Sequence, residues 1–560
     1  MEPRRTNDSA SLSAKTVRAP MRMTGPVRVV CLLAISAAVW LPGLGTWERL
    51  SYHEAFVAQG AREMLDSGEW SYPTIGGRPW LEKPPLPWWL VVAIGRAVGG
   101  VDETVARLPS AIAATLMVLG VSTFATRYYG PGLGLIAGAV QATTAWSALR
   151  GRLAEADILL AALVTWTVVA FDRMLVEGSE EGPVRRRWRW AFFVLLGTMS
   201  MVKGIGFGPV LTVGAIASAI VWRRDGRALR SLMFPAGWIV SAAIALAWPI
   251  AMIARHGTSA LSLWILHVAD RLAERPSAFI GEPWWEYVPG VFAQAMPWAP
   301  IAVVGAWHSL RRGVLGRLAG GTVPASVVAG DRLLWAWSAA PLVLLSMATI
   351  KNAHYAIAAQ VPWSIWAALG LARISRKLVH RGRSPERLKR VAAVGFATLA
   401  ILYGMGFSLL APGLDWRGRE GAFYETAGRR LPPGTPVALL YDDFDRNPYE
   451  SPFGAVPHDL GVRLFYLRRP ARVIRGRRPG DETPAEGRSC PPALRVLRPT
   501  SEAPVYLIAR ERDRPDLDRL GRLELLERGP STRFDREYHL FRLDARPMAV
   551  ADLDESDPTR

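Results

Sequence analysis

Residues 51–89 read SYHEAFVAQGAREMLDSGEWSYPTIGGRPWLEKPPLPWW and follow the first apolar segment of membrane length. The stretch mixes ionisable side chains with four tryptophans and a Glu-Lys-Pro-Pro turn at residues 82–85. Tryptophan is enriched where a protein meets the membrane–water interface. A solvated tether has little need of this composition, so we expect the chemistry of the protein to lie in this loop, at a bilayer surface.

The composition of the whole chain is that of a membrane protein. Half of its 560 residues are apolar, and many uninterrupted apolar runs are expected to be long enough to cross a bilayer as a helix. The net charge of +19 comes from short Lys and Arg clusters between those runs, which is the pattern of cytoplasmic loops. The sequence therefore predicts a polytopic α-helical membrane protein and argues against a nucleic-acid partner. Cys31 lies in the first apolar segment and Cys490 lies in a polar region far along the chain, so the two cysteines imply no disulfide framework.

Eleven apolar segments are candidate membrane spans, with a total between 10 and 13 because some are short. The first is too long for the apolar core of a signal peptide and lacks a clean cleavage site, so we expect it to remain uncleaved. Residues 86–99 are too few to span and predict a juxtamembrane helix. The eleven segments are 27–44, 105–126, 132–149, 158–171, 188–202, 206–222, 232–254, 288–309, 334–350, 355–372 and 391–411.

Charge sets the orientation of these segments. Starting from a cytoplasmic N-terminus and alternating sides places the basic stretches 127, 185–189, 223–230, 311–317 and 373–390 inside, as the positive-inside rule requires. We therefore predict a multi-pass protein of the plasma membrane, the inner membrane in a bacterium. Its C-terminal region then lies outside the cytoplasm.

The chain divides into three regions by composition. Residues 1–26 form a cytoplasmic tail, and residues 27–412 form a transmembrane domain whose first outer loop, 45–104, carries juxtamembrane helices. Residues 413–560 alternate β-rich patches with Pro-, Arg- and Asp-rich connections, which predicts a soluble extracytoplasmic α/β or α+β domain. The patches that predict strands are 436–441, 464–467, 504–509 and 538–543.

On this topology the outer-side ionisable residues gather in a few places at the ends of apolar helices. Charge at such a position is costly without a partner or a watery cavity, so we predict a polar cavity at the outer interface. Its candidate residues are His53, Glu54, Arg62, Glu63, Glu82 and Lys83 in the first loop, then Arg150, Arg152, Glu155, Asp157 and Lys203, then His256, His267, Asp270, Arg271, Glu274 and Arg275, and finally Lys351, Asn352, His354 and Tyr355.

Several short motifs follow one another along the chain, each occurring once. They are HEAFVAQGAREML at 53–65, EKPPLPWW at 82–89, ARLPS at 106–110, EAD at 155–157, KG at 203–204, HVADR at 267–271, PWWEY at 283–287 and KNAHY at 351–355. In these motifs the sequence resembles the GT-C membrane glycosyltransferases, the family of the protein O-mannosyltransferases and the bacterial lipid A aminoarabinose transferase. The resemblance covers the whole length.

The resemblance implies a GT-C transmembrane fold and transfer of a monosaccharide from a polyprenyl phosphate to a lipid, protein or polymer acceptor on the outer face, with inversion. A base near the acceptor and cations near the leaving phosphate suit that chemistry. Lys83, Lys203 and Arg271 are the candidates for the phosphate, and Arg62, Lys351, His354 and Tyr355 for other substrate contacts. Glu82 and His267 match the family's metal-binding pair, which implies a divalent Zn, Mg or Mn ion. Asp157 matches the acid of the second outer loop. We expect a monomer.

One position departs from the family. Where the resemblance leads us to expect Asp-Glu, this chain has His53-Glu54, and three interpretations stay open. His53 can be the general base, since an imidazole titrates near neutral pH. Alternatively, Glu54 or Asp157 is the base and His53 a metal ligand or donor contact. In the third interpretation transfer is lost, and the protein binds or senses a lipid-linked sugar.

Plainer interpretations compete at several of these positions. The glycines after Lys203 are more typical of a helix break than of a phosphate loop, so we expect no nucleotide cofactor. Arg62 with Glu63 can be a solvated pair, His267 a hydrogen-bonding residue, and His354 with Tyr355 interface anchors. A secondary transporter would place polar groups near the bilayer midplane in two similar halves, a pattern that we do not find in this sequence.

Overall fold

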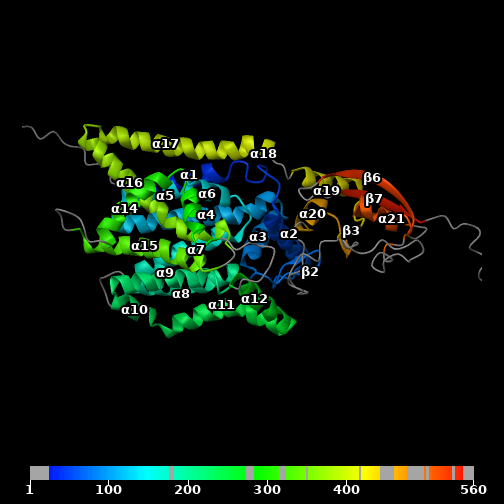
Figure 1. Cartoon of the computed structure of the whole chain (residues 1–560), viewed down its shortest axis with the longest axis horizontal. Helices are drawn as coiled ribbons and strands as arrows, with labels where there is room; N and C mark the ends of the chain where they lie inside the picture. The colour runs from blue at the N-terminus through cyan, green and yellow to red at the C-terminus, as the bar shows by residue number, and fades with distance from the viewer. Residues whose placement is uncertain are drawn as a thin grey trace, which may run out of the picture.

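The computed structural model describes residues 24–175, 182–272, 283–314, 323–348, 351–414, 418–441, 460–475, 497, 499, 503–531 and 537–545. For residues 266–272 it describes the backbone alone. A bundle of long helices forms one end of the molecule, a sheet domain forms the other, and α2 (Tyr52–Ser67) and α3 (Leu86–Val98) lie between them (Figure 1). The loop between α1 (Gly25–Trp40) and α4 (Glu103–Tyr129) therefore lies where the two parts meet.

The helical bundle contains a helix, or a pair of helices, at each of the eleven segments that the sequence marks as apolar. Its elements are α1 (Gly25–Trp40), α4 (Glu103–Tyr129), α5 (Pro131–Ala142), α6 (Ala145–Arg150), α7 (Ala156–Met174), α8 (Pro183–Lys203), α9 (Gly208–Arg223), α10 (Gly226–Leu232), α11 (Pro235–His256), α12 (Thr258–Leu272), α13 (Tyr287–Gln294), α14 (Ala299–Ser309), η1 (Leu310–Val314), α15 (Ala325–Ser346), η2 (Ala353–Ala356), α16 (Ile357–His380), α17 (Pro385–Met405), η3 (Gly406–Leu410) and α18 (Ala411–Leu414).

Five helical segments among the described residues are long and apolar enough to cross a membrane: 103–129, 235–256, 325–346, 353–380 and 385–414. A sixth span is formed if α13 and α14, which meet at 113°, are counted together. Helices α1, α3, α5 and α9 are apolar but shorter. A 16-residue helix such as α1 is about 24 Å long, less than the roughly 30 Å hydrocarbon core. The protein is thus a multi-pass membrane protein, and the predicted count of about eleven spans stays a prediction.

The C-terminal region predicted at residues 413–560 is called the tail from here on. It contains a five-stranded sheet with the strand order β4-β3-β5-β7-β6. Strand β3 (Val437–Tyr441) runs parallel to β4 (Ala471–Arg475) and β5 (Val505–Arg510), whereas β7 (Glu537–Asp544) runs antiparallel to β5 and to β6 (Arg522–Ser531). The helices α19 (Gly418–Arg430), α20 (Leu460–Leu467), η6 (Glu511–Asp513) and α21 (Arg514–Leu517) complete the described part. A mixed helix-and-sheet domain was predicted here, and it is present.

One predicted strand is wrong. Residues 464–467 belong to helix α20, of which all eight residues are buried. A short run of apolar residues buried on every side has no polar face, so periodicity cannot distinguish a strand from a helix. Strands β3, β5 and β7 lie at the other three predicted patches, whereas β4 and β6 were not predicted.

The loop between α1 and α4 shares a hydrophobic core with the tail. Residues of α2 and α3, among them Phe56 and Trp88, pack in one cluster with Tyr424, Leu460 and Phe465 of the tail. The loop also contains a small hairpin, β1 (Thr74–Ile75) and β2 (Arg78–Pro79). As a result, the loop is packed between bundle and tail and is not a solvated tether.

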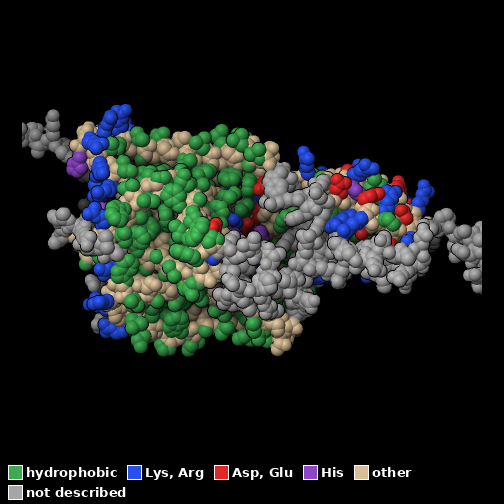
Figure 2. Space-filling model, viewed as in Figure 1, with side chains coloured by type: hydrophobic (Ala, Val, Ile, Leu, Met, Phe, Trp, Pro, Cys, Tyr) green, Lys and Arg blue, Asp and Glu red, His purple; other side chains and the backbone are tan. Residues whose placement is uncertain are grey.

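Basic side chains gather at the end of the bundle that lies farthest from the sheet domain, and apolar side chains cover the flank between the two ends (Figure 2). The α16–α17 turn and α10 lie at this basic end (Figure 1). Both belong to stretches that charge alone predicts to be cytoplasmic. The long axis of the molecule is therefore the axis along which charge and hydropathy are ordered.

Candidate functional site between bundle and tail

Helix α2 presents His53 in its first turn. Ser51 caps the helix by accepting a hydrogen bond from the Glu54 amide at 3.4 Å, and the Glu54 carboxylate accepts one in return from the Ser51 amide at 2.9 Å. Such a capping box satisfies two amides that the helix itself leaves unpaired. His53 is exposed while Glu54 is fully buried. Adjacent residues of one turn thus point to opposite environments.

Glu54 is held in a buried ion pair with Arg107 of α4. Arg107 Nε donates to Glu54 Oε1 at 2.8 Å, both side chains are completely buried, and the Ala154 amide donates to the same oxygen at 3.1 Å. Burial alone would raise the pKa of Glu54, but Arg107 and the amides of Ser51 and Ala154 hold it below the usual value. A carboxylate with all these donors is poorly suited to take a proton from a substrate. We therefore assign Glu54 to positioning the first turn of α2.

Asp157 and Lys203 form the polar centre of the site. Asp157 lies in the first turn of α7 and Lys203 is the last residue of α8, where Gly204 turns the chain with φ of +81°. Lys203 Nζ lies 2.5 Å from Asp157 Oδ1, and both side chains are largely buried. The ammonium also lies 4.8 Å from the ring centre of Tyr355. The glycine-containing segment after Lys203 separates α8 from α9, in agreement with the predicted helix break.

Other predicted residues surround this pair. His354 and Tyr355 lie in η2 with their rings 4.6 Å apart. The charges of Asp157, Lys203, Arg150 and His53 all act on the His354 imidazole. Those of Lys203, Tyr355 and Asp157 likewise act on Lys83, which is half-buried before α3. These ionisable groups therefore gather in one recess, and Figure 2 shows acidic, basic and His side chains in a hollow between bundle and tail. The residues of the recess are His53, Lys83, Arg150, Asp157, Lys203, His354 and Tyr355.

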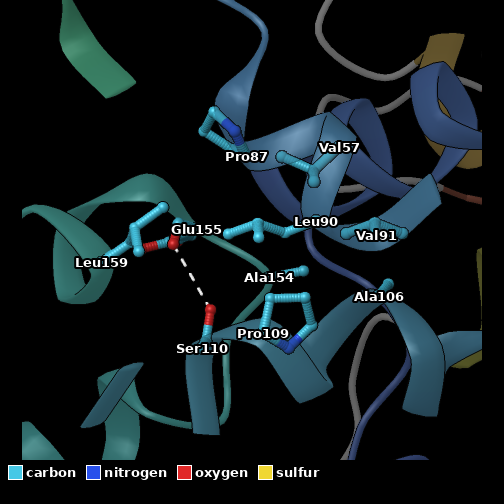
Figure 3. Close-up of a pocket in the computed structure, with 10 residues that line it drawn as sticks. All are labelled: Val57, Pro87, Leu90, Val91, Ala106, Pro109, Ser110, Ala154, Glu155 and Leu159. Atoms are coloured by element: carbon cyan, nitrogen blue, oxygen red, sulfur yellow. Dashed lines mark hydrogen bonds between the residues drawn. The ribbon is translucent and has the colours of Figure 1, made fainter. Parts of the chain in front are cut away.

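A narrow crevice lined mainly by apolar side chains includes Glu155, two residues before Asp157 (Figure 3). Ser110 donates to the carbonyl oxygen of Glu155 at 3.4 Å across its floor, and the Glu155 carboxylate pairs with Arg150. The crevice runs between α2, α3, α4 and the start of α7. Its lining residues are Val57, Pro87, Leu90, Val91, Ala106, Pro109, Ser110, Ala154, Glu155 and Leu159.

Two residues that were predicted to contact the substrate, Arg62 and Lys351, donate hydrogen bonds to backbone carbonyl oxygens. Arg62 donates to the carbonyl oxygens of Phe465 and Val101, both at 2.8 Å, and its guanidinium lies 4.0 Å from the Phe465 ring centre. Burial lowers the pKa of Arg62 to about 10. Lys351 is buried and donates to the Ala348 carbonyl at 2.7 Å. Both side chains fix neighbouring backbone, and Arg62 in particular links the loop to the tail.

Glu63 is not the solvated partner of Arg62. Its carboxylate accepts hydrogen bonds from Thr74 Oγ1 and the Gly76 amide, both at 2.7 Å, and from the Gly77 amide at 3.1 Å. Gly76 and Gly77 both have positive φ, as the tight turn of a hairpin requires. Glu63 therefore anchors the hairpin that closes the loop.

The far side of the loop is held by α11 and α12. Arg255 pairs with Glu69 at 2.7 Å, and Trp248 and Trp264 donate to the carbonyl oxygens of Ser71 and Leu81 at 2.8 and 2.7 Å. The backbone that leads to Glu82 and Lys83 is thus fixed by side chains of the neighbouring helices.

The predicted metal pair is only half described. Glu82 is half-buried next to Lys83, but the side chains of His267 and Arg271 lie outside the described residues, although both belong to α12. Among the side chains that are described, no three His, Cys, Asp or Glu residues lie close enough together to hold a metal ion. The divalent ion stays a proposal, and no chemical step below depends on it.

The sequence signal missed one residue that shapes the site. Arg107 was seen only as part of the ARLPS motif, yet it is completely buried and holds Glu54. Its position inside an apolar helix was the available signal, because an arginine there needs a partner. Arg150, by contrast, was named among the candidate residues of the cavity but was given no role in catalysis or substrate binding.

Fold and site together define a polytopic membrane protein with a polar site at one end of the bundle, closed by the first loop and a sheet-containing tail. The solved structure of ArnT from Cupriavidus metallidurans in the apo state has this fold, with a TM-score of 0.69 at 16% identity over 91% of this chain and 97% of that one. The structure of ArnT bound to undecaprenyl phosphate matches with a TM-score of 0.67 at 17% identity, over 92% and 98% of the two chains.

The sequence comparisons point the same way. Residues 26–265 match the family described as dolichyl-phosphate-mannose-protein mannosyltransferase. The undecaprenyl phosphate-alpha-4-amino-4-deoxy-L-arabinose arabinosyl transferase of Pseudomonas aeruginosa strain UCBPP-PA14 is 28% identical over 367 residues, 62% of this chain and 61% of the relative. That of Edwardsiella ictaluri is 28% identical over 365 residues, 63% and 60%. The match thus spans about three fifths of these relatives. The predicted resemblance to the GT-C glycosyltransferases is confirmed.

Proposed function

We propose that the protein is a membrane glycosyltransferase that moves a monosaccharide from a polyprenyl phosphate to an acceptor, with inversion at the anomeric carbon. The observation that carries this proposal is the convergence of His53, Lys83, Asp157, Lys203 and His354 at the end of the bundle that faces the tail. The matching relatives are named as transferases, which favours turnover over the alternative of binding or sensing. Lipids, proteins and polymers all remain candidate acceptors, and we keep the monomer as our proposal for the assembly.

The reaction needs one base and a place for the leaving phosphate. The acceptor hydroxyl attacks the anomeric carbon, its oxygen forms the new glycosidic bond, and the bond from that carbon to the phosphate oxygen breaks. Lys83 and Lys203 are placed to compensate the charge that develops on the phosphate. Asp157 and His53 are the groups that we propose to accept the acceptor proton. Glu54 is not a third, since its oxygens are already occupied.

The apolar crevice is the place that we assign to the lipid part of such a donor. Its lining includes Val57, Leu90, Val91 and Leu159, together with Glu155, two residues before Asp157 (Figure 3). The crevice has room for no more than about one water molecule in this structure, so a donor would have to widen it on binding. Each methylene that is then buried gains about 0.8 kcal/mol.

The direct test is turnover by the purified full-length protein. Labelled polyprenyl-phosphate sugars are incubated with the protein in detergent, and release of polyprenyl phosphate is followed for wild type, His53→Ala and Asp157→Asn. We expect release with at least one donor and its loss in one or both variants. Binding of polyprenyl phosphate with no turnover of any donor would instead support the sensing alternative.

We also propose that the N-terminus is cytoplasmic, that the tail is extracytoplasmic and that the membrane is the plasma membrane. With Cys31 and Cys490 changed to serine, an impermeant maleimide added to intact cells should label Arg512→Cys in the tail and leave Arg376→Cys unlabelled. Both residues are exposed in the structure, so access across the membrane decides the result. Labelling of Arg376→Cys from outside would contradict the orientation.

The affinity for polyprenyl phosphate should fall as pH rises. This fall should begin at a lower pH than it would if the phosphate were bound by a lysine of ordinary pKa. Burial, followed by repulsion from Lys203, lowers the pKa of Lys83 from a usual value of about 10.4. Binding is complete where the ammonium is charged and is lost as pH rises through the lowered pKa. The phosphate itself ionises near pH 6 and does not interfere above about pH 7.

Lys83→Arg supplies the matched control, since a guanidinium stays charged over this range. Binding of polyprenyl phosphate is titrated from about pH 7 to about pH 10. The wild-type affinity should fall over this range while that of the variant stays nearly constant. Parallel curves would show that Lys83 does not bind the phosphate.

A further inference from the structure

Helix α20 of the tail is packed against the first loop. Helix α20 of the tail packs against α2, which carries His53, within the shared core described above. The two backbones come so close at Gly461 that an added Cβ would lie 3.2 Å from the carbonyl carbon of Ala55 and from the Phe56 amide nitrogen. Such an approach leaves no room for solvent. The tail is therefore packed directly against the helix that enters the site.

Tyr466 of α20 makes a polar contact at the start of α2. Its hydroxyl accepts a hydrogen bond from the Leu50 amide at 2.8 Å, and this bond is buried. Its ring lies 4.9 Å from the guanidinium of Arg49, and Arg49 pairs with Glu425 of the tail at 3.0 Å. Tyr466 is 2% exposed. A single tail residue thus holds the backbone immediately before the Ser51 cap.

The first turn of α2 is therefore held by contacts from both the bundle and the tail. From the bundle, Arg107 holds Glu54. From the tail, Tyr466 holds Leu50, four residues earlier. His53 lies between these two attachments and is the exposed member of the turn. Its position over the site is thereby set jointly by two parts of the chain more than 350 residues apart.

We propose that Tyr466 is a positioning residue, through which the tail fixes the first turn of α2 and so aims His53 into the site. The inference rests on the proposed glycosyl transfer and adds to it a role for the tail in the chemical step. A hydroxyl that only filled the tail core would affect stability alone. A positioning hydroxyl affects the rate of turnover at unchanged donor binding.

Tyr466→Phe is the test, because it removes the hydroxyl and keeps the ring. We expect kcat to fall about tenfold, within the range that small misplacements of a catalytic group cost, while KM for the donor stays the same. Hydrogen exchange in a peptide covering residues 49–57 should become faster. Rates are normalised to the amount of polyprenyl phosphate bound, so that loss of folded protein does not mimic the effect.

Tyr538→Phe is the matched control. Tyr538 is equally buried, and its hydroxyl accepts from Arg510 at 2.9 Å within the tail. It should leave kcat and the exchange of residues 49–57 unchanged. Equal exchange in wild type and Tyr466→Phe would overturn the inference, as would faster exchange with unaltered kcat. If wild type turns over no donor, the proposed function fails, and the exchange experiment still decides whether Tyr466 fixes this turn.

Discussion

Replacing Arg107 with alanine is expected to destabilise the folded protein by about 3–5 kcal/mol, the cost of leaving one partner of a buried ion pair uncompensated. Both side chains of the pair are completely buried. Removing the guanidinium would leave the Glu54 carboxylate with only the amide donors of Ser51 and Ala154. Unfolding by denaturant in a mild detergent, followed by tryptophan fluorescence, measures the change.

Arg152→Ala is the matched control for this loss. Arg152 is also completely buried, but it donates to the carbonyl oxygens of Val39 and Pro42 at 2.6 and 2.8 Å. Its removal leaves neutral acceptors unpaired, which costs about 1–3 kcal/mol. If the two variants lost equal stability, the charge of Glu54 would not be what makes Arg107 necessary.

The same variant should respond to pH in a defined direction. In wild type the pKa of Glu54 is lowered, so the stability from this pair is present above the unfolded pKa of about 4.3 and is lost as pH falls through the folded pKa. In Arg107→Ala, burial acts without its main compensation, and the pKa of Glu54 should rise above normal. The stability gap between variant and wild type should therefore narrow on acidification. A gap independent of pH would contradict the assignment.

The candidate residues of the site could be predicted from the sequence, but the different role of each residue could not. His53 and Glu54 are neighbours, and both carry groups that can move protons. Helical geometry then turns one into the recess and the other into the core, where a distant arginine meets it. No local pattern identifies that partner, because Arg107 lies 53 residues away. The adjacent Asp-Glu of the family therefore does not imply two catalytic acids in this chain.

The fold shows where pattern reading has enough information. Apolar runs located the helices of the bundle because a bilayer imposes length and composition on its spans. Helix α20 could not be recognised, since it is buried on all sides by α2, α19 and the sheet. The docking of the tail on α2 likewise depends on contacts between residues far apart in sequence. These are the contacts that determine where His53 lies.

Asp157→Asn is expected to lower kcat by about 10²–10⁴, the range that a positioned acid or base contributes. Lys203→Met should cost a comparable factor, because it removes both a cation beside the phosphate and the partner that keeps Asp157 charged in a largely buried setting. Transfer of a labelled sugar under single-turnover conditions isolates the chemical step from donor binding.

The double variant makes the prediction sharper. Residues that act as a unit show strongly non-additive effects, so Asp157→Asn with Lys203→Met should be little worse than the more damaging single change. Asp172→Asn is the control, since Asp172 lies near the opposite end of α7, is buried and pairs with Arg127 at 2.6 Å. It should reduce stability without changing the rate of transfer. Fully additive losses at Asp157 and Lys203 would mean that their 2.5 Å contact is not maintained during turnover, and that the phosphate draws Lys203 away from Asp157.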